Sequence, residues 1–171
     1  HGSFEKYRKA KLNFFKYAQS KKAEIFFNQD DKSVDFFKNE FDQEKINLYS
    51  KKDLQDYFLL DKDHYLFSSE FNQENLAAAV SLARFLKIDD QIIKQAILKF
   101  FGVPGRMEVL RASKNIGSGE KKEFKIVIDY AHTPDSLEKV YLNLKSGTKK
   151  LICVLGSAGG GRDKWKRPRM G

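Results

Sequence analysis

The chain has 171 residues, of which 41% are hydrophobic and 13% aromatic, and this composition excludes global disorder. Its net charge of +9 raises nucleic-acid binding as an alternative, but the lysines alternate with acidic residues along most of the chain and favour a solvated surface. A single cysteine excludes an intrachain disulfide, and no apolar run approaches the roughly 18 residues of a membrane-spanning helix, so we expect a cytoplasmic protein without membrane insertion.

The first hundred residues predict helices mixed with short strands. Ser3 is a suitable N-cap for a helix that runs to about Ala18. At about 100° per residue this helix has one apolar stripe with Lys11 in its middle, formed by Phe4, Tyr7, Phe14, Phe15 and Ala18. Further along we expect a strand at Ala23–Asn28 and helices at Val34–Phe41, Asn75–Leu86 and Asp89–Phe101. Residues 46–69 are weakly patterned, with strand-like pieces at Tyr57–Leu60 and Tyr65–Phe67.

Gly102 and Pro104 end this half of the chain and separate it from a second half. Beyond them the pattern predicts a helix at Asp135–Leu144 and strands at Met107–Ala112, Phe124–Ile128 and Leu151–Leu155. A strand, a helix and a strand with short connections form a βαβ unit, so the second half is expected to contain a parallel sheet. Cys153 lies in the last apolar run and is expected to be a small buried residue. The predicted fold class is therefore α/β.

Charged residues stand at the joint between the halves and at the end of the next strand. Arg106 lies beside a turn built from glycine and proline, where a guanidinium suits ribose or phosphate contacts, although pairing with Glu108 is the alternative. Asp129 and His132 directly follow the strand, and open α/β sheets bind ligands where strands end in such turns. Asp129 could instead serve only to form a turn or cap a helix. Together these residues predict a nucleotide site built across a hinge.

Five blocks in order along the chain carry a resemblance to a known family. They are H-G-S-F-E-K-Y with K-A-K-L, F-N-Q-E-N-L-A-A-A, the joint G-V-P-G-R-M-E, D-Y-A-H-T-P-D-S-L-E-K, and residues 156–171. In this order they resemble the Mur ligases, specifically the UDP-N-acetylmuramyl-tripeptide synthetases. The resemblance implies that residues 1–101 are the C-terminal half of a central P-loop-type ATPase domain, that 102–106 are a hinge, and that 107–171 begin a Rossmann-like C-terminal domain. We therefore expect the chain to be part of a longer protein.

The resemblance also implies roles for single residues in the first half. Lys11 would be carbamylated, which turns a cation into an anion able to hold Mg²⁺, whereas a lysine that reaches past the stripe to solvent is the alternative. Asn75 would present its amide to adenine, and simple helix capping by Asn72 and Asn75 is the alternative. His1 matches the second histidine of the family's D-H-x-D-Y-H-G stretch rather than the metal-binding first one, so it would be a structural or substrate-side neighbour.

In the second half the resemblance implies contacts with ATP and with the incoming amino acid. Arg106 would contact ribose or phosphate, Asp129 would accept from ribose hydroxyls, and His132 would approach the phosphates. The glycine-rich run 156–161 has P-loop spacing, but Arg-Asp follows it instead of Lys-Ser or Lys-Thr, so it is not the principal ATP loop. By its match to the family, Arg162 would bind a carboxylate of the amino acid and Lys164 would assist at the reacting phosphate.

The implied function is an ATP-dependent amide ligase of peptidoglycan precursor synthesis, with ATP and Mg²⁺ as cofactors. ATP would phosphorylate the D-glutamyl carboxylate of UDP-N-acetylmuramyl-L-alanyl-D-glutamate, and the amine of L-lysine or meso-diaminopimelate would attack the acyl phosphate after hinge closure. We expect a monomer, and no turnover by these 171 residues alone, because the family's G-x-x-G-K-T/S and D-N-P-R motifs do not occur in them. The alternatives are a folylpolyglutamate-synthase-like ligase, whose turn usually reads D-G-A-H-N-P, and a basic nucleic-acid-binding module, favoured only by charge.

Overall fold

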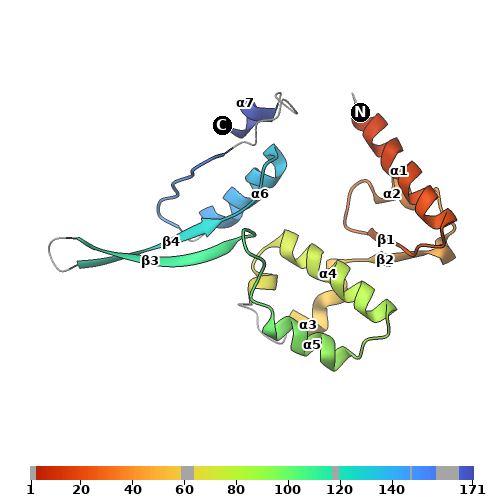
Figure 1. Cartoon of the computed structure of the whole chain (residues 1–171), viewed down its shortest axis with the longest axis horizontal. Coiled ribbons are helices and arrows are strands. Elements are labelled where there is room, and N and C mark those ends of the chain that lie inside the picture. The colour runs from red at the N-terminus through yellow and green to blue at the C-terminus, as the bar shows by residue number, and fades with distance from the viewer. Residues whose placement is uncertain (1–2, 59–63, 117–119, 147, 157–165) are drawn as a thin grey trace. The chain divides into compact units, whose positions relative to one another are not determined.

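The computed structural model describes residues 3–58, 64–116, 120–146, 148–156 and 166–171. The chain divides into two compact units, residues 1–100 and residues 101–171 (Figure 1). Each unit contains both helices and strands, in agreement with the predicted α/β class. Among the described residues, no helix has the length and apolar character that crossing a membrane requires.

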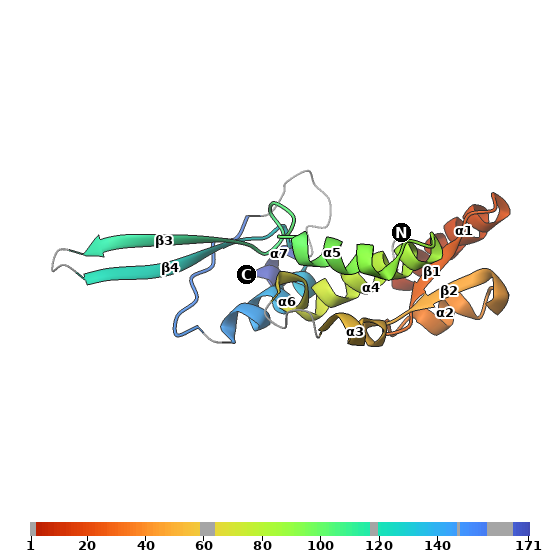
Figure 2. The same cartoon turned by 90° about the horizontal axis from the view of Figure 1, so that it is seen from below.

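The first unit places helices around a small parallel sheet. Strand β1 (Ile25–Asn28) pairs with β2 (Ile46–Tyr49) in parallel, in a register that sets Ile25 opposite Ile46. Its α-helices are α1 (Phe4–Ser20), α2 (Val34–Lys38), α3 (Gln55–Phe58), α4 (Glu70–Phe85) and α5 (Asp90–Lys99), with 3-10 turns at Gln43–Lys45, Lys51–Leu54 and Tyr65–Phe67. Helices α4 and α5 lie side by side (Figures 1 and 2).

Two hydrophobic clusters stabilise this unit. The first joins α1 to the sheet and consists of Leu12, Ile25, Phe27 and Phe41, with the Phe15 ring meeting the Phe27 ring edge-on at 5.1 Å. The second lies among α3, α4 and α5 and includes Leu54, Tyr57, Leu76, Ala77, Val80, Ile93 and Ile97. Burial of each large aliphatic side chain contributes about 1.5–3 kcal/mol to folding, so these clusters set the arrangement of the helices.

The predicted apolar stripe of α1 is covered in part, since Phe15 and Ala18 pack against the cluster around Leu12, and the predicted N-cap is confirmed. Ser3 accepts a hydrogen bond from the Lys6 N–H at 3.2 Å. The buried residue is Leu12, which lies about 100° around the helix from Lys11, while the predicted stripe leaves Phe4, Tyr7 and Phe14 exposed. The helix carries a wider arc of apolar residues than one stripe, and the sheet covers the edge that holds Leu12 and Phe15.

The predictions between residues 46 and 86 were also partly wrong. Tyr57 and Phe58 are helical rather than extended, and Tyr65–Phe67 is a 3-10 turn; residues 59 and 60 lie outside the described part. Helix α4 starts at Glu70, five residues before the expected start, because the Ser69 side chain accepts from the Asn72 N–H and caps it. The asparagines are therefore inside the helix and do not cap it.

The second unit contains an antiparallel hairpin and a helix. Strand β3 (Glu108–Ile116) pairs with β4 (Glu120–Ile128) so that Glu108 faces Ile128. Helix α6 (Pro134–Lys145) begins with a capping box in which Thr133 and Ser136 satisfy each other's backbone N–H groups, and a short α7 (Arg167–Met170) follows later. Leu137 and Val140 of α6 are buried together with Met170.

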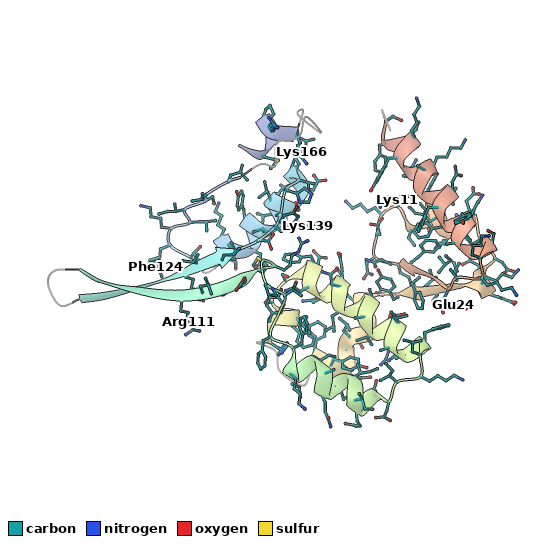
Figure 3. The ribbon with its side chains drawn as sticks, in the orientation of Figure 1. Lys11, Glu24, Arg111, Phe124, Lys139 and Lys166 are labelled. Atoms are coloured by element: carbon teal, nitrogen blue, oxygen red, sulfur yellow. The ribbon has the colours of Figure 1, made fainter. Side chains whose placement is uncertain are left out.

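The predicted parallel βαβ unit is not formed by the described residues. Residues 151–156 make no strand, and Cys153, expected to be buried, is exposed along with Ile152 and Val154. The two strands that do form follow each other closely in the chain, so they pair as a hairpin, which needs no crossover connection. Arg111 and Phe124 project from opposite faces of this hairpin (Figure 3), as the alternation of side chains along a strand requires.

Candidate functional site

A tight turn in the second unit fixes the backbone on both sides of Arg106. The Arg106 N–H donates to the Val103 carbonyl at 3.0 Å, and Gly105 has φ +69° after Pro104, the arrangement of a type II turn. Met107 also has a positive φ, of 49°, which is rare for a residue with a side chain. Arg106 is thus held between two residues in the left-handed region, and only the first is a glycine.

Asp129 ties this turn to the end of β4. One carboxylate oxygen accepts from the Met107 N–H at 2.8 Å and the other from the Ala131 N–H at 2.7 Å. The register explains the contact, because Glu108 and Ile128 face each other and the next residues of the two strands, Met107 and Asp129, come together beyond them. Asp129 therefore forms a turn, as one interpretation of the sequence predicted, and it also holds the strained Met107 backbone in place.

The Arg106 guanidinium lies over the ring of Tyr130, with its central carbon 5.0 Å from the ring centre. The His132 ring is 5.1 Å from the same Tyr130 ring, and its Nδ1 lies 3.0 Å from the Tyr130 carbonyl oxygen. All three side chains are exposed. The Glu108 carboxylate, considered as a partner for Arg106, accepts from the Gly105 N–H at 2.8 Å. The structure thus gathers Arg106, Asp129 and His132, three of the predicted residues, within one unit.

Tyr130 is the member of this group that sequence reasoning missed. It stands in the D-Y-A-H turn, but its neighbours Asp129 and His132 carried the recognisable chemistry. An aromatic residue in a turn that closes on an arginine is the signal that could have identified it, because a guanidinium stacks readily on an aromatic face. Helix α6 starts directly after this turn, so its N-terminal N–H groups add positive potential close to His132.

Lys11 is exposed on α1 in the first unit (Figure 3). Its Nζ lies 4.9 Å from the centre of the Tyr7 ring, one helical turn earlier. The amine thus reaches solvent, as one interpretation of the sequence allowed, and Leu12 occupies the packed side of the helix. Within the described residues no group of three or more His, Cys, Asp or Glu side chains has a geometry that could hold a metal ion.

The two asparagines of α4 differ sharply in their surroundings. Asn72 is buried, and its side-chain amide donates to the Tyr65 carbonyl at 3.1 Å, so it anchors the preceding 3-10 turn. Asn75 is exposed almost one turn later, and its amide makes no hydrogen bond within the described part of the chain. Asn75 is thus the asparagine that can offer both a donor and an acceptor to a ligand.

A charged cluster that the sequence did not predict joins the carboxyl ends of β1 and β2 to the start of α4. Asp30 accepts from the Ser50 hydroxyl at 2.9 Å and from the Lys51 N–H at 2.8 Å, and this backbone donor lowers the pKa of the Asp30 carboxyl. The Lys51 ammonium pairs with Glu70 and lies 3.8 Å from Glu74, and the bond to Glu70 raises the pKa of Lys51. Glu70 therefore links the start of α4 to Lys51, which follows β2.

Three predicted site residues, His1, Arg162 and Lys164, lie outside the described residues.

Comparison with known proteins shows which family the chain is similar to. A family profile described as Mur ligase, glutamate ligase domain, matches residues 105–171, the stretch that contains Arg106 and Asp129. A 2,6-diaminopimelate ligase of Synechocystis sp. (strain ATCC 27184 / PCC 6803 / Kazusa) is 32% identical over 197 aligned positions that cover the whole chain and 36% of that relative. The chain is a Mur ligase homologue.

Other similar Mur ligases match over shorter stretches. The UDP-N-acetylmuramoyl-L-alanyl-D-glutamate--2,6-diaminopimelate ligases of Trichormus variabilis and Aquifex aeolicus are 42% and 44% identical over 106 and 103 residues. Each of these alignments covers 60% of this chain and 19% of the relative. The chain thus matches about a third or less of the length of these curated Mur ligases.

Proposed function

We propose that this chain supplies nucleotide- and substrate-binding residues of an ATP-dependent amide ligase that adds 2,6-diaminopimelate to UDP-N-acetylmuramoyl-L-alanyl-D-glutamate in peptidoglycan precursor synthesis. The observation that carries the proposal is the similarity along the whole chain to the Synechocystis ligase, whose name states this reaction. The geometry around Asp129 supports it, since this carboxylate bonds the backbone beside Arg106 and the Tyr130 ring contacts both Arg106 and His132.

Four residues form the proposed nucleotide contacts. Asp129 uses one lone pair of each carboxylate oxygen for a backbone N–H, and each oxygen retains capacity to accept from a ribose hydroxyl. Arg106 and His132 lie beside it and suit the ribose and the phosphates. Asn75 of α4 has an exposed amide that suits the donor and acceptor edge of adenine.

Lys11 is proposed as the carbamylated lysine that helps to hold Mg²⁺. Its amine is exposed, so CO₂ can reach it, and carbamate oxygens are the kind of ligand that Mg²⁺ prefers. When bound, Mg²⁺ neutralises part of the charge that accumulates as a carboxylate meets a triphosphate. Lys11 fits this role as one ligand among several and not as a complete metal site.

The remaining roles rest on the family resemblance alone. Arg162 would bind a carboxylate of the incoming amino acid, Lys164 would assist at the reacting phosphate, and His1 would lie near the substrate. In the reaction, a carboxylate oxygen of the D-glutamyl group attacks the γ-phosphorus and ADP leaves. The amine nitrogen then attacks the carbonyl carbon, the phosphate leaves, and the nitrogen loses a proton to give the amide. We further propose that the protein is a cytoplasmic monomer that binds no nucleic acid.

The test measures ADP release and amide formation by the protein that contains this chain, with the UDP-linked dipeptide and either 2,6-diaminopimelate or L-lysine. We expect both products to depend on the dipeptide and on 2,6-diaminopimelate. Lys11→Gln should abolish amide formation, whereas Lys9→Gln, which changes an exposed lysine of the same helix, should not. Absence of amide product with both amino acids would contradict the proposal, and full activity of the Lys11 variant would remove the role of Lys11. Strongly salt-dependent binding to any duplex would instead favour the nucleic-acid alternative.

A further inference from the structure

We infer that Tyr130 is a positioning residue, whose ring holds the Arg106 guanidinium in place for an anionic group of the nucleotide. This inference rests on the proposed function, because it assigns a purpose to the contact between these two side chains. Tyr130 itself would touch neither the reacting carboxylate nor the amine.

Hydrogen bonds fix the backbone on both sides of the contact. Arg106 is fixed by the turn closed by the Val103 carbonyl, and Tyr130 lies between Asp129 and Ala131, which are joined by a hydrogen bond of 2.7 Å. The bond from the Met107 N–H to Asp129 ties the two segments together at 2.8 Å. The backbones of Arg106 and Tyr130 are therefore held near each other, which keeps the ring within reach of the arginine side chain.

Tyr130 is exposed although it is a large aromatic residue. The side chain is 62% exposed, so its ring contributes little to the hydrophobic core of the second unit. A flat ring with a cation at 5.0 Å from its centre nevertheless restricts the rotamers of that cation. An arginine that is already ordered loses less entropy when it binds a phosphate or a ribose, so binding is tighter.

His132 lies on the same tyrosine. Its ring contacts the Tyr130 ring at 5.1 Å, so the tyrosine lies next to both groups that are proposed to face the nucleotide. One aromatic ring thereby contacts both an arginine and a histidine that are 26 residues apart in the sequence. The binding step, and not the chemical step, should depend on it.

The test compares three variants of the protein that contains this chain. Tyr130→Leu removes the ring, Tyr130→Phe retains it, and Tyr17→Leu removes an equally exposed tyrosine of α1 that also carries a cation, Lys21, over its ring. We expect Tyr130→Leu to raise the KM for ATP by roughly two- to fivefold with kcat unchanged, the range that a cation–π contact at an exposed site supports. Tyr130→Phe and Tyr17→Leu should keep the parental KM.

A second measurement separates this inference from the proposed function. In NMR spectra of the 171-residue chain, ring current from Tyr130 should shift the Arg106 side-chain resonances, and the shift should persist in Tyr130→Phe and vanish in Tyr130→Leu. If the parent protein makes no amide, the proposed function fails whatever the spectra show. If the parent is active, a parental KM for Tyr130→Leu, an equal loss in Tyr130→Phe, or a fall confined to kcat each overturns the positioning role.

Discussion

Replacing Asp129 with alanine should destabilise the second unit as well as weaken nucleotide binding. The change removes two hydrogen bonds to a charged acceptor, from the N–H groups of Met107 and Ala131. Such bonds contribute about 1.5–3 kcal/mol each when well buried, and Asp129 is only half-buried, so we expect about 1 kcal/mol from each. The Met107 N–H is in addition left without its acceptor in a buried residue with a positive φ, which brings the expected total to about 2–3 kcal/mol.

Amide hydrogen exchange of the 171-residue chain measures this effect locally. Each 1.4 kcal/mol lost raises the exchange rate of an N–H about tenfold, so a loss of about 1 kcal/mol should make Ala131 exchange about five times faster in Asp129→Ala. For Met107, with a loss of about 1–2 kcal/mol, the rise should be about 5- to 30-fold. Asp129→Asn should fall between the parent and the alanine variant, because an amide offers one oxygen acceptor instead of two. Glu138→Ala is the control, since it removes an exposed acid of the same unit that makes no hydrogen bond within the described residues. Unchanged exchange at both amides in Asp129→Ala would show that the Asp129 carboxylate does not stabilise the Met107 and Ala131 N–H groups, and it would leave ligand binding as its only role.

Three further predictions concern stability. Burial raises the pKa of Tyr57 to about 12, above its ordinary value near 10, so the unfolding free energy of the first unit should fall as the pH rises from about 10 to about 12. Urea titrations of Tyr57→Phe should show a smaller fall over this range. An equal fall in the variant would contradict the raised pKa of Tyr57 as the cause. In the same titration, Leu76→Ala should lower the unfolding free energy by about 2–4 kcal/mol. Leu82→Ala, on the exposed face of the same helix, should lower it by less than about 1 kcal/mol. Similar losses in the two variants would place Leu76 outside the core. Gly105→Ala should lower the unfolding free energy of the second unit by about 1 kcal/mol, because Gly105 has a positive φ. The control Gly156→Ala should leave that free energy almost unchanged. If both variants lowered the melting temperature equally, backbone strain at Gly105 would be ruled out as the cause.

Several boundaries could be predicted because local chemistry decides them. Ser3 caps α1 and Asp89 caps α5 through side-chain oxygens that accept nearby N–H groups, and neither contact needs a distant partner. Gly102 and Pro104 interrupt helical geometry by their own backbone constraints, and the division of the chain after Phe100 lies close to them. The turn-forming role of Asp129 follows from the same kind of local bonding.

The candidate site was only partly predictable. The family blocks drew attention to Arg106, Asp129 and His132, but their geometry depends on the pairing of β3 with β4, which brings Met107 next to Asp129 across 22 positions of sequence. The contact of Tyr130 with Arg106 follows from that same pairing. The cluster of Asp30, Lys51 and Glu70 was missed because its members look like ordinary surface charges until the carboxyl ends of β1 and β2 are placed beside α4.

The sequence by itself determined the mixed α/β character of the chain, several helix starts and the chemical types available for binding, because these depend on propensities and contacts within a few residues. The tertiary structure decided which edge of α1 is covered, which strands pair, and which asparagine of α4 is buried. Those outcomes are settled by competition among alternative apolar surfaces and partners far apart in the chain. Helix α1 illustrates this, because Leu12 is buried beside Phe15 and Ala18 whereas Phe4, Tyr7 and Phe14 stay exposed, and the position of β1 decides which side of the helix is covered.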